Sequence, residues 1–164
     1  MKIFAIFAVT ALTTFLGYWL ASKYIQRKDF FNAIVFFANL MEVEVGFSQK
    51  KTEEIINENI KKFCAEFQKL LTLFIASLNT KKTITTAEIS NVAKFLKNEE
   101  IQEIFLFFNG IGKYDSENQI KNITSHNKQF VLWQTNAKQE SNKYVKLYVK
   151  LGFLLGLIIS IIIM

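Results

Sequence analysis

Residues that could carry out chemistry are few in this chain. Among its 164 residues, His126 is the only histidine and Cys64 the only cysteine, so a Cys–His nucleophile would depend on these two alone. No phosphate-binding glycine loop, His-Glu-x-x-His motif or pair of Cys-x-x-Cys motifs occurs. The sequence therefore predicts a protein that is not an enzyme, with no catalytic residue, no bound metal and no cofactor.

Each candidate has a simpler interpretation. His126 lies among polar residues of a helical pattern, which indicates a solvated surface side chain. Cys64 falls within the apolar stripe of its predicted helix, which favours core packing over reactivity. Asn122-Ile123-Thr124 matches a glycosylation sequon, but the cytoplasmic placement argued below makes the match accidental.

Acidic side chains form the second group of candidates. On a helical wheel, Glu44 falls near the middle of an apolar face, between Phe30 and Phe37, where burying an unpartnered carboxylate is costly. Glu44 therefore caps a neighbouring helix, sits at the mouth of the bundle or marks a docking surface for another protein. Glu42 points elsewhere and is predicted to be solvated. Three further acidic residues open a helix, where its dipole favours negative charge: Glu99, Glu100 and Glu103.

Two apolar segments lie at the ends of the chain. Residues 3–20 are uncharged and, at ~1.5 Å per residue, ~27 Å long, which is enough to cross a hydrocarbon core. Residues 151–164 reach only ~21 Å, but a start at Leu147, with Lys150 extending to the headgroups, gives a workable span. We therefore predict transmembrane helices at residues 1–22 and 147–164. A signal peptide cleaved after Ala21 is the alternative for the first segment, although this run is long for one.

Basic residues gather beside these segments. The flanks hold seven basic and no acidic residues, whereas residues 29–142 hold 13 basic and 14 acidic residues. Because Lys and Arg near a span favour the cytoplasmic side, the middle is predicted to be cytoplasmic and the termini outside. A nearly neutral middle also argues against nucleic-acid binding, despite the net charge of +6. The orienting residues are Lys23, Arg27, Lys28, Lys143, Lys146 and Lys150.

The middle segment, residues 29–142, is predicted to be a domain of helices, since the chain has no proline. Asp29 is the expected N-cap of the first helix, a short helix is expected over 52–59, and Thr85 with Glu88 has capping-box spacing. The predicted fold is all-α: a cytoplasmic bundle of about six helices flanked by N- and C-terminal transmembrane helices.

The last helix of this domain is expected to follow a tight glycine corner. Gly110 and Gly112 end the preceding helix, and Ser116 has the S-x-x-Q capping spacing with Gln119. The helical pattern then runs into the terminal span. A bend is expected over residues 136–142, because that stretch is polar on all sides.

Three segments follow an order found in a known family. Residues 40–47 (Leu-Met-Glu-Val-Glu-Val-Gly-Phe) are similar to a leucine–glutamate–x–glutamate–isoleucine–x–tyrosine stretch, and residues 111–119 to a leucine–glycine–x–serine–aspartate–x–x–x–glutamine corner. Residues 144–164 are similar to a tyrosine-rich approach to a glycine-containing span. Together they resemble the stage III sporulation protein AB family. Two departures are Gln49-Lys50-Lys51, where the family has threonine–proline–leucine, and Tyr114, where it has a small residue.

The resemblance implies a mother-cell membrane component of the channel complex between mother cell and forespore. It also implies a helical domain similar to the inner-membrane platform proteins of type II secretion and type IV pilus systems. The expected partners are the bilayer, a secretion-type ATPase and other channel-complex membrane proteins; homo-oligomerisation stays open. The alternative is a platform subunit of a pilus or type II-like secretion system outside sporulation. The residues expected to serve docking or structure are Glu42, Glu44, Gly112, Asp115 and Gln119.

Overall fold

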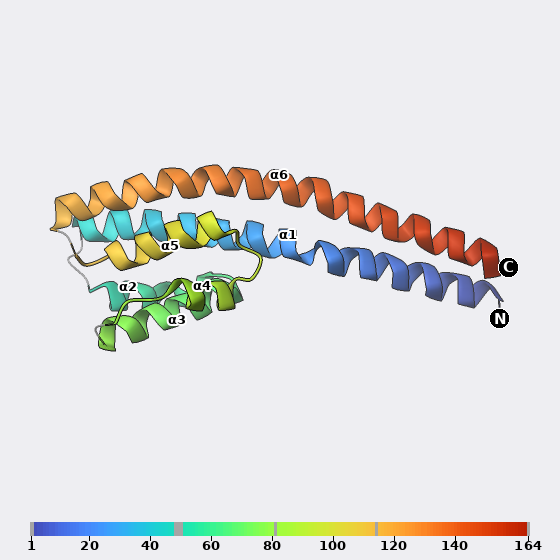
Figure 1. Ribbon diagram of the computed structural model, residues 1–164, viewed down its shortest axis with the longest axis horizontal. Coiled ribbons are helices and arrows are strands. Elements are labelled where there is room, and N and C mark those ends of the chain that lie inside the picture. Colours follow the sequence, from blue (N-terminus) through green and yellow to red (C-terminus); the bar gives the residue numbers. More distant parts are fainter. Residues whose placement is uncertain (1, 48–50, 81, 114, 164) are drawn as a thin grey trace. The chain divides into compact units, whose positions relative to one another are not determined.

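The computed structural model describes residues 2–47, 51–80, 82–113 and 115–163. Within them the chain forms α-helices and one short 3-10 turn, η1 (Ile60–Lys62), and no strand (Figure 1). The all-α prediction is therefore confirmed. The helices are α1 (Lys2–Phe47), α2 (Thr52–Asn59), α3 (Ala65–Thr80), α4 (Thr86–Val92), α5 (Asn98–Gly110) and α6 (Ser116–Ile163).

The chain divides into two compact units. One comprises residues 1–28 and 135–164 and is called the helical hairpin here; the other comprises residues 29–134 and is called the bundle. Helices α1 and α6 contribute to both units, so the apolar spans are continuous with bundle helices instead of being separate elements. The three-domain limits drawn from the sequence stay a prediction.

The helical hairpin is held together by close contact at glycines. A Cβ added to Gly152 would lie 2.5 Å from the carbonyl oxygen of Thr13, and one added to Gly17 would meet the carbonyl oxygen of Tyr148. Gly156 fits against the backbone of Thr10 in the same way. Such small residues let two helices approach closely in an apolar environment. The G-x-x-x-G spacing of Gly152 and Gly156 thus serves packing within the chain.

Polar groups inside the hairpin are satisfied locally. The hydroxyl groups of Thr10, Thr13 and Thr14 each donate a hydrogen bond to a carbonyl oxygen about one turn earlier in α1. The Thr10 hydroxyl also lies 3.4 Å from that of Ser160 on α6. Because an unsatisfied polar group is costly in a hydrocarbon environment, these bonds suit a membrane setting.

Helices α1 and α6 are both long and apolar enough to cross a membrane, judged by length and composition. Their most apolar 18-residue windows have mean hydropathies of 1.2 and 2.1, and only 11% and 17% of those windows is buried. Large apolar side chains therefore face outward, among them Phe7, Phe15, Leu154 and Ile158. This outward face fits the predicted pair of membrane-spanning segments.

A buried ion pair also joins the two helices of the hairpin. The guanidinium of Arg27 donates to the carboxylate of Glu140 at 2.6 Å, and the Arg27 side chain is only 7% exposed. Arg27 was predicted to be one of several basic residues beside the membrane, yet its charge is matched within the chain. The ring of Tyr24 stacks on that of Tyr144 at 4.6 Å nearby.

Replacing Arg27 with alanine is expected to destabilise the hairpin by about 1–2 kcal/mol, less than for a fully buried pair because water reaches Glu140. The measurement is thermal unfolding of the full chain in detergent, followed by circular dichroism. Lys23→Ala, at an exposed position nearby, is the control and should have little effect. Equal decreases in the unfolding temperature of the two variants would contradict the prediction.

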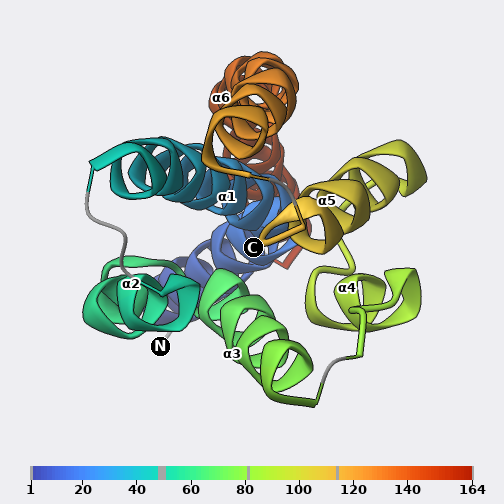
Figure 2. The same cartoon turned by 90° about the vertical axis from the view of Figure 1, so that its left-hand side faces the viewer.

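The bundle has three layers: α6, then α1 with α5, then α2, α3 and α4 (Figures 1 and 2). Phenylalanine rings fill its centre. The Phe37 ring is fully buried; it stacks on Phe108 with 5.9 Å between ring centroids and meets the edge of Phe67 at 5.8 Å. Such aromatic pairs add to the stabilisation from apolar burial. The fully buried rings are Phe30, Phe31, Phe37, Phe67, Phe107, Phe108 and Phe130.

Several helix ends differ from those expected. Asp29 does not cap a helix, because α1 runs through it without a break from Lys2 to Phe47. Over residues 136–142 the helix α6 is continuous, and the burial of Ala137 and Ser141 gives this stretch an inward face, although it was expected to be polar on all sides. The bend expected there stays a prediction. The short helix over 52–59 and the Thr85–Glu88 capping box are confirmed.

Candidate docking site

Residues 40–47, the first segment that the sequence singles out, contact α6 just after the second segment, residues 111–119, at one end of the bundle. The hydroxyl of Thr124 on α6 donates a hydrogen bond to the Glu42 carboxylate on α1 at 3.0 Å. A Cβ added to Gly46 would lie 3.6 Å from the Ile120 side chain. The last turns of α1 therefore lie against the first turns of α6, as Figure 1 also shows. We treat this end of the bundle as the candidate site.

The two glutamates of this site are both half-buried. Glu42 was predicted to be solvated; it is half-buried, and the Thr124 hydroxyl also reaches its carboxylate from α6. Glu44 also has an interaction partner within the chain. Glu44 sits in the last turn of α1, between exposed Val43 and half-buried Val45.

The corner between α5 and α6 is shaped by glycine. Gly112 has φ of +80°, in the left-handed region that L side chains rarely adopt, so the residue type is dictated by the backbone. The amide of Lys113 donates to the carbonyl of Gly110 at 3.3 Å and closes the turn. The family departures at Gln49, Lys50 and Tyr114 lie outside the described residues.

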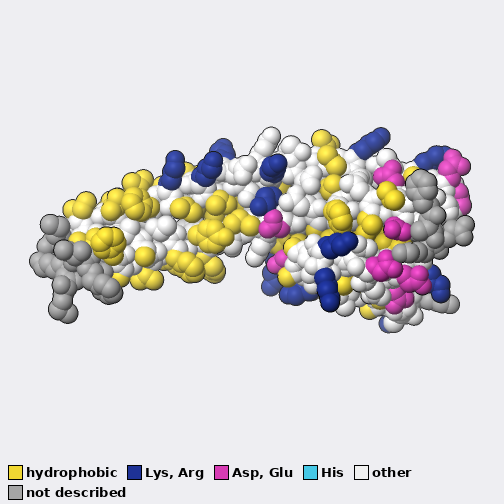
Figure 3. Space-filling model, turned by 180° about the vertical axis from the view of Figure 1, so that it is seen from behind, with side chains coloured by type: hydrophobic (Ala, Val, Ile, Leu, Met, Phe, Trp, Pro, Cys, Tyr) yellow, Lys and Arg dark blue, Asp and Glu magenta, His cyan; other side chains and the backbone are white. Residues whose placement is uncertain are grey.

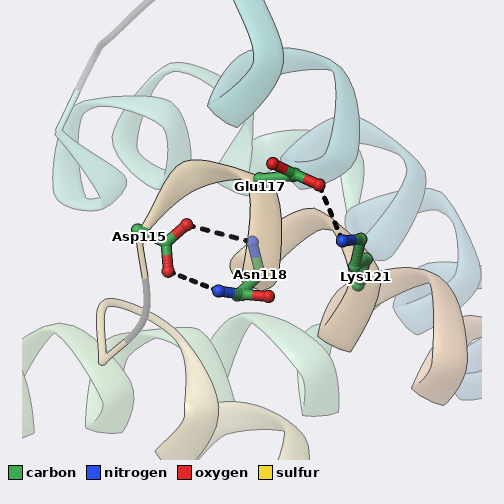
Figure 4. Close-up of polar contacts among 4 residues, drawn as sticks. All are labelled: Asp115, Glu117, Asn118 and Lys121. Carbon is green, nitrogen blue, oxygen red and sulfur yellow. Dashed lines mark hydrogen bonds and ion pairs between the residues drawn. The ribbon is translucent and has the colours of Figure 1, made fainter.

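Asp115 caps α6 (Figure 4). Its carboxylate accepts hydrogen bonds from the side-chain amide of Asn118 at 2.7 Å and from the Asn118 backbone N–H at 3.5 Å. The hydrogen bond from the Asn118 side chain holds the pKa of Asp115 below its ordinary value. The predicted cap at Ser116 is therefore one residue too late. Gln119, in the first turn of α6, is buried and its N–H bonds the Asp115 carbonyl at 2.8 Å.

The cap predicts a pH dependence of stability. The pKa of Asp115 is lower in the folded state than in the unfolded chain. The contribution of Asp115 to folding stability is therefore fully present above the ordinary aspartate pKa of about 4 and is lost as the pH falls through the folded-state pKa. Asp115→Ala should therefore lower the urea midpoint at neutral pH, and the difference from the parent should vanish in acid. Glu117→Gln is the control, because the ion pair of Glu117 with Lys121 is exposed. A difference that persists in acid would contradict the assignment.

Acidic side chains gather at this end of the bundle (Figure 3). They come from the last turns of α1, the first turn of α2 and the start of α6. Glu54, Asp115 and Glu117 are exposed. Exposed lysines lie among these carboxylates, namely Lys51, Lys113 and Lys121, the last of which pairs with Glu117. A basic partner would therefore meet individual carboxylates, which favour its encounter, and not a surface of one charge. Within the described residues, no group of three His, Cys, Asp or Glu is arranged to hold a metal ion.

Residues 2–164 match the family described as Stage III sporulation protein AB. The chain belongs to this family. The match covers essentially the whole chain, so the resemblance drawn from its three segments is confirmed and the chain is a sporulation protein. No curated protein and no solved structure matches it significantly.

The structure shows the surroundings of His126 and Cys64, the two residues that could have been reactive. His126 is not solvated: its Nδ1 lies 2.7 Å from the Glu103 carboxylate, and its ring packs beside those of Phe107 and Phe130. Cys64 is half-buried, and burial raises the pKa of its thiol above the ordinary value, which disfavours the reactive thiolate. The partner of His126 lies 23 residues away, so the local sequence carried no signal for it.

Proposed function

We propose that this chain is a membrane-anchored, non-catalytic scaffold of the channel complex between mother cell and forespore. In this proposal the helical hairpin anchors the chain in the mother-cell membrane, and the bundle lies in the cytoplasm. The acidic end of the bundle docks a secretion-type ATPase, while other membrane proteins of the channel are neighbours. The observation that carries the proposal is the contact of residues 40–47 with Ile120 and Thr124, just after residues 111–119, at an end of the bundle that carries exposed carboxylates.

The residues of this end divide into two roles. Glu42, Gly112, Asp115 and Gln119 hold the surface in shape, through the bond to Thr124, the left-handed turn and the cap of α6. The exposed carboxylates around them present the charge. Charged groups at the rim of an interface mainly set the rate and salt dependence of association. The partner is therefore expected to offer a basic surface.

The energy for transport must come from the partner in this scheme. The sequence has no glycine-rich phosphate-binding loop, and a scaffold needs none, because its task is to hold the nucleotide-hydrolysing subunit at the membrane. We assign nucleotide hydrolysis to the ATPase and positioning to this chain.

Capture of the ATPase by the full-length chain in lipid nanodiscs tests the proposal. Glu54→Lys with Glu117→Lys reverses two exposed charges at the site and should weaken capture by about tenfold at low salt. Glu99→Lys is the control, because Glu99 is also exposed but lies in the first turn of α5, about 17 Å along that helix from Gly110. Circular dichroism verifies folding of each variant. Undiminished capture by a folded double variant would contradict the docking role.

A further inference from the structure

One face of α6 within the helical hairpin carries both lysines and a groove. Lys143, Lys146, Lys150, Phe153 and Leu157 follow one another at intervals of three or four residues, so they share one side of the helix. All five are exposed. Dark-blue basic side chains border the mainly apolar surface in the same way in Figure 3. This helix face is therefore positively charged at the lysines and becomes apolar toward Leu157.

Two adjoining grooves run along this face. The larger, of about 760 Å³, extends from Tyr18 and Val149 to Phe7 and Leu157. The smaller, of about 380 Å³, is lined by Lys150 and Leu154, and both grooves share Thr14, Val149 and Phe153. The stem of a lysine thus forms part of an apolar groove, with its ammonium group free to extend toward the headgroups.

The dimensions match one leaflet. Lys146 and Leu157 are eleven residues apart on a continuous helix, which corresponds to ~16 Å. Half of a typical hydrocarbon core is ~15 Å thick. A molecule with a negative head and a hydrocarbon tail of that length would meet the lysines at one end and the groove at the other.

We propose that this face binds an anionic phospholipid, with its phosphate at Lys146 and Lys150 and an acyl chain in the groove along Phe153 and Leu157. A transmembrane helix is the less suitable occupant. The small residues that permit close helix contact, Gly152 and Gly156, are turned toward α1 and already used there. A lipid phosphate accepts hydrogen bonds from the lysine ammonium groups, whereas an apolar helix offers them no acceptor.

Fluorescence quenching by brominated lipids tests this site in the full-length chain. The reporter is Phe153→Trp in a background of Trp19→Phe and Trp133→Phe, reconstituted in phosphatidylcholine vesicles. Brominated phosphatidylglycerol should bind next to the reporter about fivefold more strongly than brominated phosphatidylcholine. Lys146→Gln with Lys150→Gln should bring this ratio close to one. Lys138→Gln, an exposed lysine off this face, should leave the ratio unchanged.

Two results would overturn the proposal. Equal quenching by both lipids in the parent would mean that the groove does not select charge. Weak quenching by both would mean that a protein helix covers it. If Phe153→Trp loses helix content, Tyr18→Trp, at another residue that lines the larger groove, takes over as reporter in the same background, and the same two results would overturn the proposal. The proposal depends on membrane insertion but not on ATPase docking, which the capture experiment tests separately.

Discussion

Gly152→Leu is expected to separate the two helices of the hairpin. Even a Cβ at this position would lie 2.5 Å from the carbonyl oxygen of Thr13, and a backbone atom can move only if the whole helix moves. Because Gly17 and Gly156 make similar contacts, the displacement cannot be absorbed along the pair. This variant should disturb the hairpin more than any polar substitution in it.

Disulfide formation measures this separation. The hydroxyl oxygens of Thr10 and Ser160 are 3.4 Å apart, so cysteines at these two positions should cross-link readily in a Cys64→Ser background. Adding Gly152→Leu should slow the cross-link by about tenfold or more. Gly46→Leu is the matched control, because the nearest atom to a Cβ there is 3.6 Å away. An unchanged rate with Gly152→Leu would show that the glycine contact does not hold the pair.

Phe37→Ala is expected to cost the bundle about 3–5 kcal/mol in free energy of unfolding. The Phe37 ring is fully buried and lies within 6.3 Å, between ring centroids, of Phe63, Phe67, Phe107 and Phe108. Its loss therefore leaves a cavity bordered by helices α1, α3 and α5.

The adjacent residue supplies the control for this prediction. Phe36 is 47% exposed, so Phe36→Ala should cost about 1 kcal/mol or less. Guanidinium unfolding of the full chain can be followed by Trp133, whose ring lies 5.8 Å from that of Phe31 inside the bundle, once Trp19 is replaced by phenylalanine. Similar losses for the two variants would show that the aromatic centre is not the main source of stability.

Features with local causes were predicted well. The limits of α2, the capping box at Thr85 and the turn at Gly112 depend on residues only a few positions apart. Even so, Asp29 and Ser116 were assigned as caps wrongly, because a cap also depends on where the neighbouring helix actually begins.

Features with remote partners could not be predicted. Glu42 meets Thr124, Arg27 meets Glu140 and His126 meets Glu103, over separations of 82, 113 and 23 residues. A helical wheel shows on which face of its own helix a residue lies. It does not show which other helix packs against that face. Glu42 was therefore assigned to solvent, although its helix face meets α6.

We propose that both long helices cross the membrane and that the bundle lies on its cytoplasmic side. Labelling of intact cells with a membrane-impermeant maleimide tests it in a Cys64→Ser background. A cysteine in place of exposed Lys51 should be labelled only after the cells are permeabilised. A cysteine appended after residue 164 should be labelled in intact cells. Labelling of both cysteines from the same side would contradict this topology.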